Sequence, residues 1–170
     1  MLKNRKGFTL VELLVVVAII GLLSTLAVVA LGNARQKARD AKRVADMKQI
    51  QTALELYFTD QNGYPSAVAA GIDLGIAGSK SLSSGANFAD VPGGTTYMAS
   101  VPANPTPGGI PYHYYSFNAP QAACPIAGTV GDCVAAGAKC VFYQVAFHLE
   151  SVTGGLAGPA DHCVSSSGLQ

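Results

Sequence analysis

The feature that most constrains this chain is an apolar run from Gly7 to Leu31, which begins almost at the first residue and contains one acidic side chain, Glu12. Between Leu13 and Leu31 no residue is charged. At ~1.5 Å per residue, a helix of that length approaches the ~30 Å hydrocarbon thickness of a bilayer. A carboxylate near the start of such a helix costs free energy unless a partner neutralises it. The run therefore predicts a membrane-spanning helix, and Glu12 indicates a function beyond anchoring.

The residues before the run are basic, since they include Lys3, Arg5 and Lys6. Because positively charged flanks stay in the cytoplasm, we expect the N-terminus inside the cell and everything after Leu31 outside the membrane. A conventional secretory signal would be cut after the apolar run, where Ser24 to Ala27 offers only a weak site.

The hexapeptide Gly7-Phe8-Thr9-Leu10-Val11-Glu12 resembles the prepilin peptidase signal of type IV pilins and type II secretion pseudopilins. The resemblance implies cleavage between Gly7 and Phe8, N-methylation of Phe8, and retention of the apolar helix in the mature chain. It also implies that Glu12 pairs with the amine on Phe8 of a neighbouring subunit while the helices pack into a filament core. A plain signal anchor that happens to contain a glutamate is the alternative interpretation.

The chain of 170 residues allows one domain plus an anchor. We expect four segments: a leader peptide, the membrane or filament-core half of a long helix, its amphipathic half, and a loop-rich globular region, at residues 1–7, 8–31, 32–61 and 62–170. The predicted fold class is α+β. As in the type IV pilin fold that the signal implies, the C-terminal half of the helix is expected to pack on a small antiparallel sheet.

The amphipathic half is predicted from apolar positions at helical spacing. These positions are Ala34, Ala38, Ala41, Val44, Ala45, Met47, Gln51, Leu54 and Phe58. Six basic residues occupy the other faces: Arg35, Lys37, Arg39, Lys42, Arg43 and Lys48. We interpret them as a solvated surface that also meets anionic headgroups, with acidic groups of neighbouring subunits as the alternative partner. The helix is expected to end at Asn62-Gly63-Tyr64-Pro65, with the glycine as a left-handed cap.

Beyond the helix, residues 66–111 predict an irregular loop with one short helix near Ala86 to Ala89. Strands are predicted at 112–117, 140–150 and 160–165, and the last two are expected to form a hairpin that turns near Ser151. In the strand at 140–150, one face carries Val141, Tyr143, Val145, Phe147 and Leu149.

All four cysteines lie in the segment expected outside the membrane, where disulfides persist. Four cysteines allow three pairings. A hairpin turn near Ser151 would place Cys140 opposite Cys163, and Cys124 and Cys133 would then close the loop before that strand. We therefore predict the bonds Cys140–Cys163 and Cys124–Cys133, with the other two pairings left open.

No catalytic residue, metal site or cofactor is predicted. The histidines at 113, 148 and 162 show no metal motif or nucleophile signature, and no phosphate-binding or dinucleotide motif is present. The segment Val101 to Tyr112 resembles the one before the sheet in major pseudopilins, which usually has an aspartate before proline and calcium ligands nearby. Asn104 occupies that position here, and Asp90 and Asp132 are distant in the sequence, so calcium is kept only as an alternative.

The predicted function is that of a structural subunit of a type IV pilus-like filament used in adhesion, motility or DNA uptake. The alternatives are a major pseudopilin of a type II secretion system and a membrane-tethered binding module outside the cytoplasm. The resemblance implies identical subunits, prepilin peptidase, inner-membrane assembly machinery and the membrane as partners. The expected location is the cell membrane before assembly, and an extracellular pilus or periplasmic pseudopilus afterwards. Beyond Gln49 the chain has two basic residues against seven acidic ones, so no nucleic-acid partner is expected.

Overall fold

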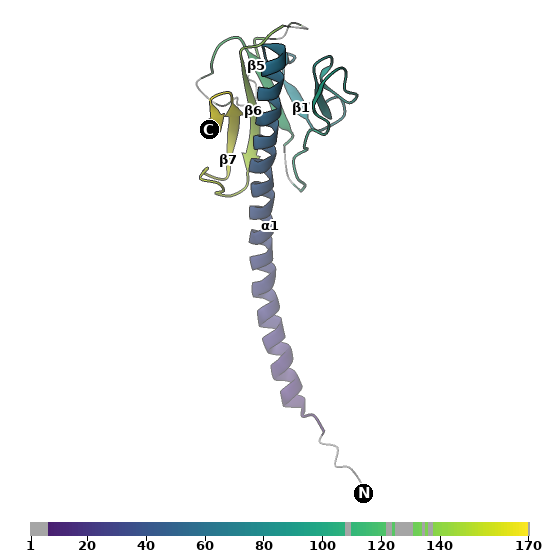
Figure 1. Ribbon diagram of the computed structural model, residues 1–170. Coiled ribbons are helices and arrows are strands. Elements are labelled where there is room, and N and C mark those ends of the chain that lie inside the picture. The colour runs from purple at the N-terminus through teal and green to yellow at the C-terminus, as the bar shows by residue number, and fades with distance from the viewer. Residues whose placement is uncertain are drawn as a thin grey trace. The chain divides into compact units, whose positions relative to one another are not determined.

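The computed structural model describes residues 7–107, 110–121, 124, 131–133, 135 and 138–169. Its one helix, α1 (Leu10–Gln61), comes first. Eight strands follow within the described residues (Figure 1): β1 (Ile72–Leu74), β2 (Ser81–Ser83), β3 (Asn87–Ala89), β4 (Thr96–Met98), β5 (Tyr112–Phe117), β6 (Phe142–Leu149), β7 (Ala160–Ser165) and β8 (Gly168–Leu169). This order confirms the predicted α+β class. The predicted leader lies outside the described residues except for Gly7.

The chain divides into two compact units, residues 1–36 and 37–170, which are described separately. In the first unit, residues 7–35 are all exposed. The helix contains no proline, so beyond its first turn each amide can reach an acceptor within the helix, as a segment in lipid requires. Its two polar side chains near the middle bond to that backbone: the Ser24 hydroxyl donates to the Ile20 carbonyl (2.7 Å) and the Thr25 hydroxyl to the Leu22 carbonyl (2.8 Å).

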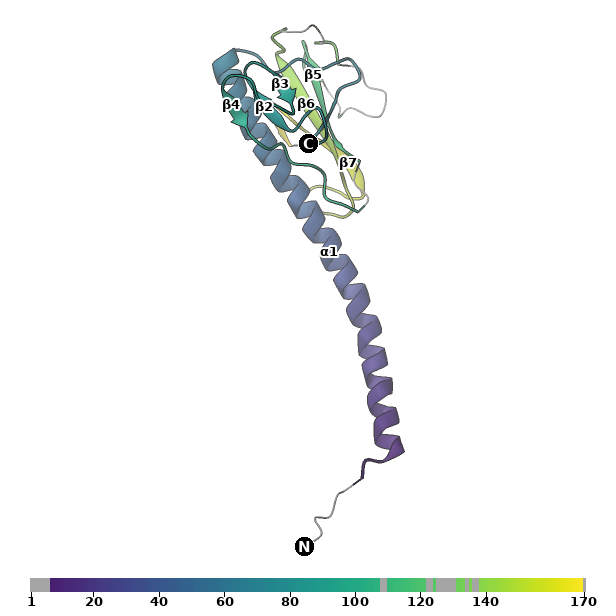
Figure 2. The same cartoon turned by 90° about the vertical axis from the view of Figure 1, so that its right-hand side faces the viewer.

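The second unit contains a five-stranded antiparallel sheet in the order β1-β5-β6-β7-β8. A smaller sheet, β3-β2-β4, lies near the C-terminal end of α1 (Figure 2). In the central strand β6, four residues of the predicted inner face are buried: Tyr143, Val145, Phe147 and Leu149. The fifth, Val141, precedes the strand and is exposed, and Gln144 of the other face is buried as well. The predicted strands at 112–117 and 160–165 match β5 and β7. Strand β7 pairs with β6 on one side and with β8 on the other.

The core lies where α1 crosses the larger sheet (Figures 1 and 2). From α1 it takes Met47, Ile50, Ala53, Leu54 and Tyr57. From β5 and β6 it takes the rings of Tyr112, Tyr114 and Tyr143, together with Val145, Phe147 and Leu149. The predicted alanine stripe is wrong, since Ala34, Ala38, Ala41 and Ala45 are exposed. The buried face instead begins with Asp40 and Arg43, whose charges are neutralised by partners described below.

Two local predictions are also corrected. The left-handed residue at the end of α1 is Asn62 (φ 57°), whose amide donates to the Phe58 carbonyl at 2.7 Å, and Gly63 does not have a positive φ. The helix predicted near Ala86 to Ala89 is strand β3, and the region called a loop contains four strands. Serine side chains stabilise these short strands; the Ser81 hydroxyl, for example, donates to the Ala89 carbonyl at 2.7 Å. Strands stabilised in this way need no alternation of apolar residues, so the sequence pattern did not predict them.

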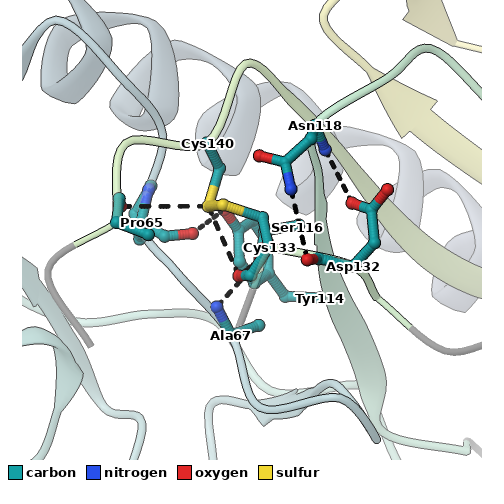
Figure 3. Close-up of a disulfide and its surroundings, with 9 residues drawn as sticks. Pro65, Ala67, Tyr114, Ser116, Asn118, Asp132, Cys133 and Cys140 are labelled. Atoms are coloured by element: carbon teal, nitrogen blue, oxygen red, sulfur yellow. Dashed lines mark hydrogen bonds between the residues drawn. A yellow bond between two sulfur atoms is a disulfide. The ribbon is translucent and has the colours of Figure 1, made fainter. Parts of the chain in front are cut away.

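The predicted disulfide pairing is wrong. The bonds are Cys124–Cys163 and Cys133–Cys140. In the β6–β7 hairpin Leu149 lies opposite Ala160, so the turn is longer than predicted and Cys163 faces Ala146. Cys140 instead pairs with Tyr64, just after the end of α1, through an isolated β-bridge, and there it meets Cys133. Figure 3 shows this bond beside β5.

Ser116 connects three segments next to the Cys133–Cys140 bond (Figure 3). Its side chain is fully buried. The hydroxyl accepts a hydrogen bond from the Ala67 amide at 2.8 Å and donates one to the Cys133 carbonyl at 2.9 Å. Because both backbone groups are enclosed, the hydroxyl satisfies two polar groups that water does not reach.

We expect Ser116→Ala to lower the free energy of unfolding by about 1–3 kcal/mol for each backbone group left without a partner. Denaturant unfolding of the full chain in detergent micelles measures this. The control is Ser166→Ala, which alters an exposed serine after β7 and is expected to change stability by less than about 0.5 kcal/mol. Equal effects of the two substitutions would contradict the structural role of Ser116.

Candidate functional site

The predicted assembly residue Glu12 lies in the first turn of α1 and closes a hydrogen-bonded ring with Thr9. Its Oε2 atom accepts hydrogen bonds from the Thr9 amide (2.9 Å) and the Thr9 hydroxyl (2.7 Å). The Thr9 hydroxyl in turn accepts a bond from the Glu12 amide at 3.3 Å. This is a capping box, in which a threonine and a glutamate three residues later satisfy each other's free amides.

For Glu12 the resemblance implied a partner in another subunit, and Thr9 was not predicted as its local partner. The signal was present, because Thr9-x-x-Glu12 directly before an apolar run is the capping-box pattern. Within the described residues the other carboxylate oxygen, Oε1, accepts no hydrogen bond. Gly7 and Phe8 precede the helix and are exposed. The structure therefore places the predicted cleavage site and Glu12 within one short, accessible segment.

The apolar side chains of the first unit form an exposed surface that runs from Phe8 to Leu31. Each large hydrophobic residue in this range is between 46% and 78% exposed. By length and composition, α1 is able to cross a membrane, and none of its most apolar stretch is buried. Such a surface needs lipid or other protein to cover it.

Two of the six predicted surface bases are bound within the second unit. Arg39 forms a two-point contact with Glu150, from Nε to Oε1 (3.0 Å) and from Nη2 to Oε2 (2.5 Å). Arg43, only 1% exposed, contacts Glu150 and Asp40 through Nη1, at 2.7 Å and 2.6 Å. The prediction that these residues form part of a solvated surface is therefore wrong for both arginines.

Asp40 is fully buried, and it ties α1 to the loop after β6. Its carboxylate accepts hydrogen bonds from the amides of Glu150 (3.0 Å) and Ser151 (2.7 Å), and from the Ser151 hydroxyl (2.6 Å). Arg43 is held further by a bond from Nε to the Asn104 amide oxygen, at 2.8 Å. We call Arg39, Asp40, Arg43, Asn104, Glu150 and Ser151 the ion-pair network.

The network shifts the pKa of both acids downward. Hydrogen bonding from Arg39 outweighs partial burial and lowers the pKa of Glu150 to about 2. Burial alone would raise the pKa of Asp40, but the hydrogen bonds from Glu150, Ser151 and Arg43 outweigh it and lower this pKa as well. Both carboxylates are thus held in their charged form, which offsets the cost of burying Arg43.

The remaining predicted bases, Arg35, Lys37, Lys42 and Lys48, are exposed. None of them makes an ion pair within the described part of the chain. They remain the cations of α1 that are able to reach a partner outside the chain.

The described residues hold no group of three or more His, Cys, Asp or Glu side chains that would bind a metal ion. Each histidine has a local contact: His113 with Asp73, His148 with Asp161 (2.7 Å) and His162 with the Ala157 carbonyl (2.5 Å). The position at which the resemblance implied an aspartate for calcium is Asn104, and its amide oxygen accepts a hydrogen bond from Arg43. The positive guanidinium of Arg43 would repel a calcium ion there.

Comparison with known proteins gives two kinds of relative. A family described as the prokaryotic N-terminal methylation motif matches residues 2–28. The type IV wide pilus major component PilA4 of Thermus thermophilus is 36% identical over 111 residues, which cover 59% of this chain and 85% of that protein. No solved structure matches.

The second kind is the type II secretion system core protein G. The protein from Pectobacterium carotovorum is 42% identical over 63 residues, and that from Escherichia coli is 40% identical over 63 residues. Each match covers 37% of this chain, and the chain spans 40% and 43% of those two proteins.

We expect Glu150→Gln to lower the free energy of unfolding at pH 7 by about 1–3 kcal/mol, because Arg39 and Arg43 lose a charged acceptor. A carboxyl group with a lowered pKa stabilises the fold above its ordinary pKa and loses this contribution as pH falls through the folded value. The difference between parent and variant should therefore shrink as pH falls from about 4.5 to about 2. Burial raises the pKa of Asp46, so this residue changes stability with pH in the opposite direction. Because parent and variant both contain Asp46, its contribution cancels when the two are compared at the same pH.

Denaturant unfolding of the full chain in detergent, repeated across this pH range, is the measurement. Asp60→Asn serves as the control, since Asp60 is exposed near the end of α1. A difference between Glu150→Gln and the parent that stays constant down to pH 2 would contradict the ion-pair network as the cause.

Proposed function

This chain belongs to the family of type IV pilins and type II secretion pseudopilins, and we propose that it is the subunit of a type IV pilus-like filament. The observation that carries the proposal is the exposed apolar half of α1, which begins at the methylation motif and is covered by nothing within the described chain. Lipid covers this surface before assembly, and the same surface of identical subunits covers it in a filament.

The extent of the matches favours a pilus over a pseudopilus. The likeness to the Thermus pilus component covers 85% of that protein, while the likeness to the secretion proteins covers less than half of theirs. The second candidate is nevertheless a major pseudopilin, because its relatives share up to 42% of the residues in the matched part. No catalytic role is proposed. Glu12 argues for assembly over a tethered binding module, because an anchor gains nothing from a carboxylate in apolar surroundings, whereas a neighbouring subunit supplies a cation for it.

The proposed maturation is cleavage between Gly7 and Phe8 by prepilin peptidase, followed by N-methylation of Phe8. The resulting amine is positively charged at neutral pH. In the filament core this amine pairs with Glu12 of a neighbouring subunit, since a charge supplied by another chain compensates a carboxylate in apolar surroundings. The capping box survives the cleavage, because the Thr9 amide and hydroxyl both belong to the mature chain.

The proposed partners follow from this scheme. They are identical subunits, prepilin peptidase, inner-membrane assembly machinery and the membrane. Before assembly the chain is a single-pass membrane protein with its second unit outside the cytoplasm, where the two disulfides are stable. After assembly it lies in an extracellular filament.

We expect filaments sheared from the native host to contain a chain that begins at methylated Phe8, with the mass of a protein in which all four cysteines are oxidised. Intact-mass and N-terminal mass spectrometry of the sheared fraction measure both. A chain processed at Phe8 but found only in the envelope would favour the pseudopilin. A chain that keeps residues 1–7 would contradict the filament proposal.

We expect Glu12→Gln to reduce filament yield at least about tenfold, because the Phe8 amine loses its charged partner. Glutamine also fits the capping box, so the start of α1 and membrane insertion should be preserved. The matched variant Thr9→Val removes the capping hydroxyl but keeps the charge, and its effect on yield should be smaller. Quantifying sheared filaments against total processed chain tests this, and a normal yield from Glu12→Gln would exclude the pairing.

A further inference from the structure

A shallow groove of about 390 Å³ lies between the outer face of α1 and strand β4, within the second unit. Most of its exposed lining is apolar and comes from Ala53, Leu56, Tyr97 and Met98, and the polar residues Lys48, Gln49 and Thr52 complete it. Leu56 is 54% exposed, although it lies between Leu54 and Tyr57, which are buried. We call this surface the Leu56 groove.

The groove adjoins the core, because Ala53 is a core residue and Tyr97 and Met98 pack against the core. Leu56 is not part of it, since other faces of the same helix turns supply Ile50, Leu54 and Tyr57. Lys48 makes no ion pair within the described residues, and its exposed side chain borders apolar surface. A cation beside an open apolar groove is suited to a partner segment that pairs an acidic side chain with an apolar one.

The same chain carries such a segment at Asp90–Val91, directly after β3. Val91 is 77% exposed, which makes it the most exposed large hydrophobic residue in the described part of the second unit. The Asp90 side chain is exposed as well, and its Oδ1 atom accepts a hydrogen bond from the Gly78 amide at 2.7 Å. That bond fixes the carboxylate and leaves Oδ2 for a cation from outside.

We propose that the Leu56 groove of one subunit binds Val91 of a second copy of this chain, and that Lys48 pairs there with Asp90. The proposal rests on the filament function proposed above and assigns one contact within it. The groove and the segment are different patches on one chain, so the contact is heterologous. A heterologous contact does not close on itself as a two-fold dimer does, and repeating it generates an open filament wherever the rotation between copies does not close a ring.

Charge complementarity favours a second copy over a lipid surface. An anionic headgroup would pair with Lys48 but would leave Asp90 and Val91 without a role. Beyond Gln49 the chain is acidic, so copies repel unless exposed acids face the exposed bases of α1. A Lys48–Asp90 contact is of this kind, and the burial of Val91 in the Leu56 groove adds an apolar contribution.

The test is a charge swap in the full chain, expressed in the native host. Lys48→Glu and Asp90→Lys should each lower the yield of sheared filaments about tenfold, because like charges then meet at every repeat of the contact. The double variant Lys48→Glu with Asp90→Lys should recover most of the parent yield. The mismatched double variant Lys37→Glu with Asp90→Lys should not, since Lys37 is an exposed base outside the groove.

A second measurement does not depend on yield. The pair Leu56→Cys and Val91→Cys, introduced together, should give chains cross-linked between copies in mild oxidant, seen as ladders on non-reducing gels of filaments. Each cysteine alone should give no ladder.

The outcomes separate this inference from the filament function. Parent filaments with normal yields from both single variants, or with no rescue by the matched double variant, would overturn the Lys48–Asp90 contact while leaving the filament function in place. Absence of the parent chain from sheared filaments would overturn the filament function itself. If anionic vesicles bound the chain through Lys48 and Asp90→Lys had no effect on filaments, the groove would belong to the membrane and the inference would fail.

Discussion

The described chain leaves one apolar helix surface uncovered, and this surface requires the protein to be in contact with lipid or with other protein. From Phe8 to Leu31 every large hydrophobic side chain is at least 46% exposed. The molecules that bury this surface must therefore lie outside the described chain. A bilayer and a bundle of identical helices satisfy this requirement equally well in hydrophobic terms. The choice between them must therefore depend on other groups, chiefly on Glu12 and on the exposed side chains of the second unit.

The second unit has the opposite arrangement, because its half of α1 is held by both apolar contacts and a buried charge network. Met47, Leu54 and the tyrosines of β5 and β6 supply the core, while Asp40 and Arg43 fix the helix to the loop after β6. Removing a single partner from such a network leaves a buried charge without compensation. The network therefore specifies one position of the helix against the sheet, whereas apolar packing alone tolerates small shifts.

The sequence predicted what depends on local pattern and missed what depends on distant pairing. The long helix, the strands β5 to β7 and the segment from Gly7 to Glu12 follow from composition, period and motif. The buried face of α1 was misplaced because alanine is compatible with either face, and because the hydrogen bonds that allow Asp40 to be buried come from residues such as Ser151, more than a hundred positions away. The disulfides were mispaired for a similar reason: the length of the β6–β7 turn sets the partner of Cys163, and no local signal fixes that length.

Glu12 is one side chain with both a local role, as part of the capping box, and a proposed role between subunits. The capping box occupies Oε2 and leaves Oε1 available within the described residues, so a local role does not compete with the proposed pairing in the filament. Holding the carboxylate in one rotamer also reduces the conformational entropy that an amine from another subunit would have to overcome. A glutamate that only capped the helix would be replaceable by glutamine, since both fit the box. The helix dipole favours a negative charge in the first turn, but once that turn lies in apolar surroundings the charge is costly unless a cation from another chain compensates it.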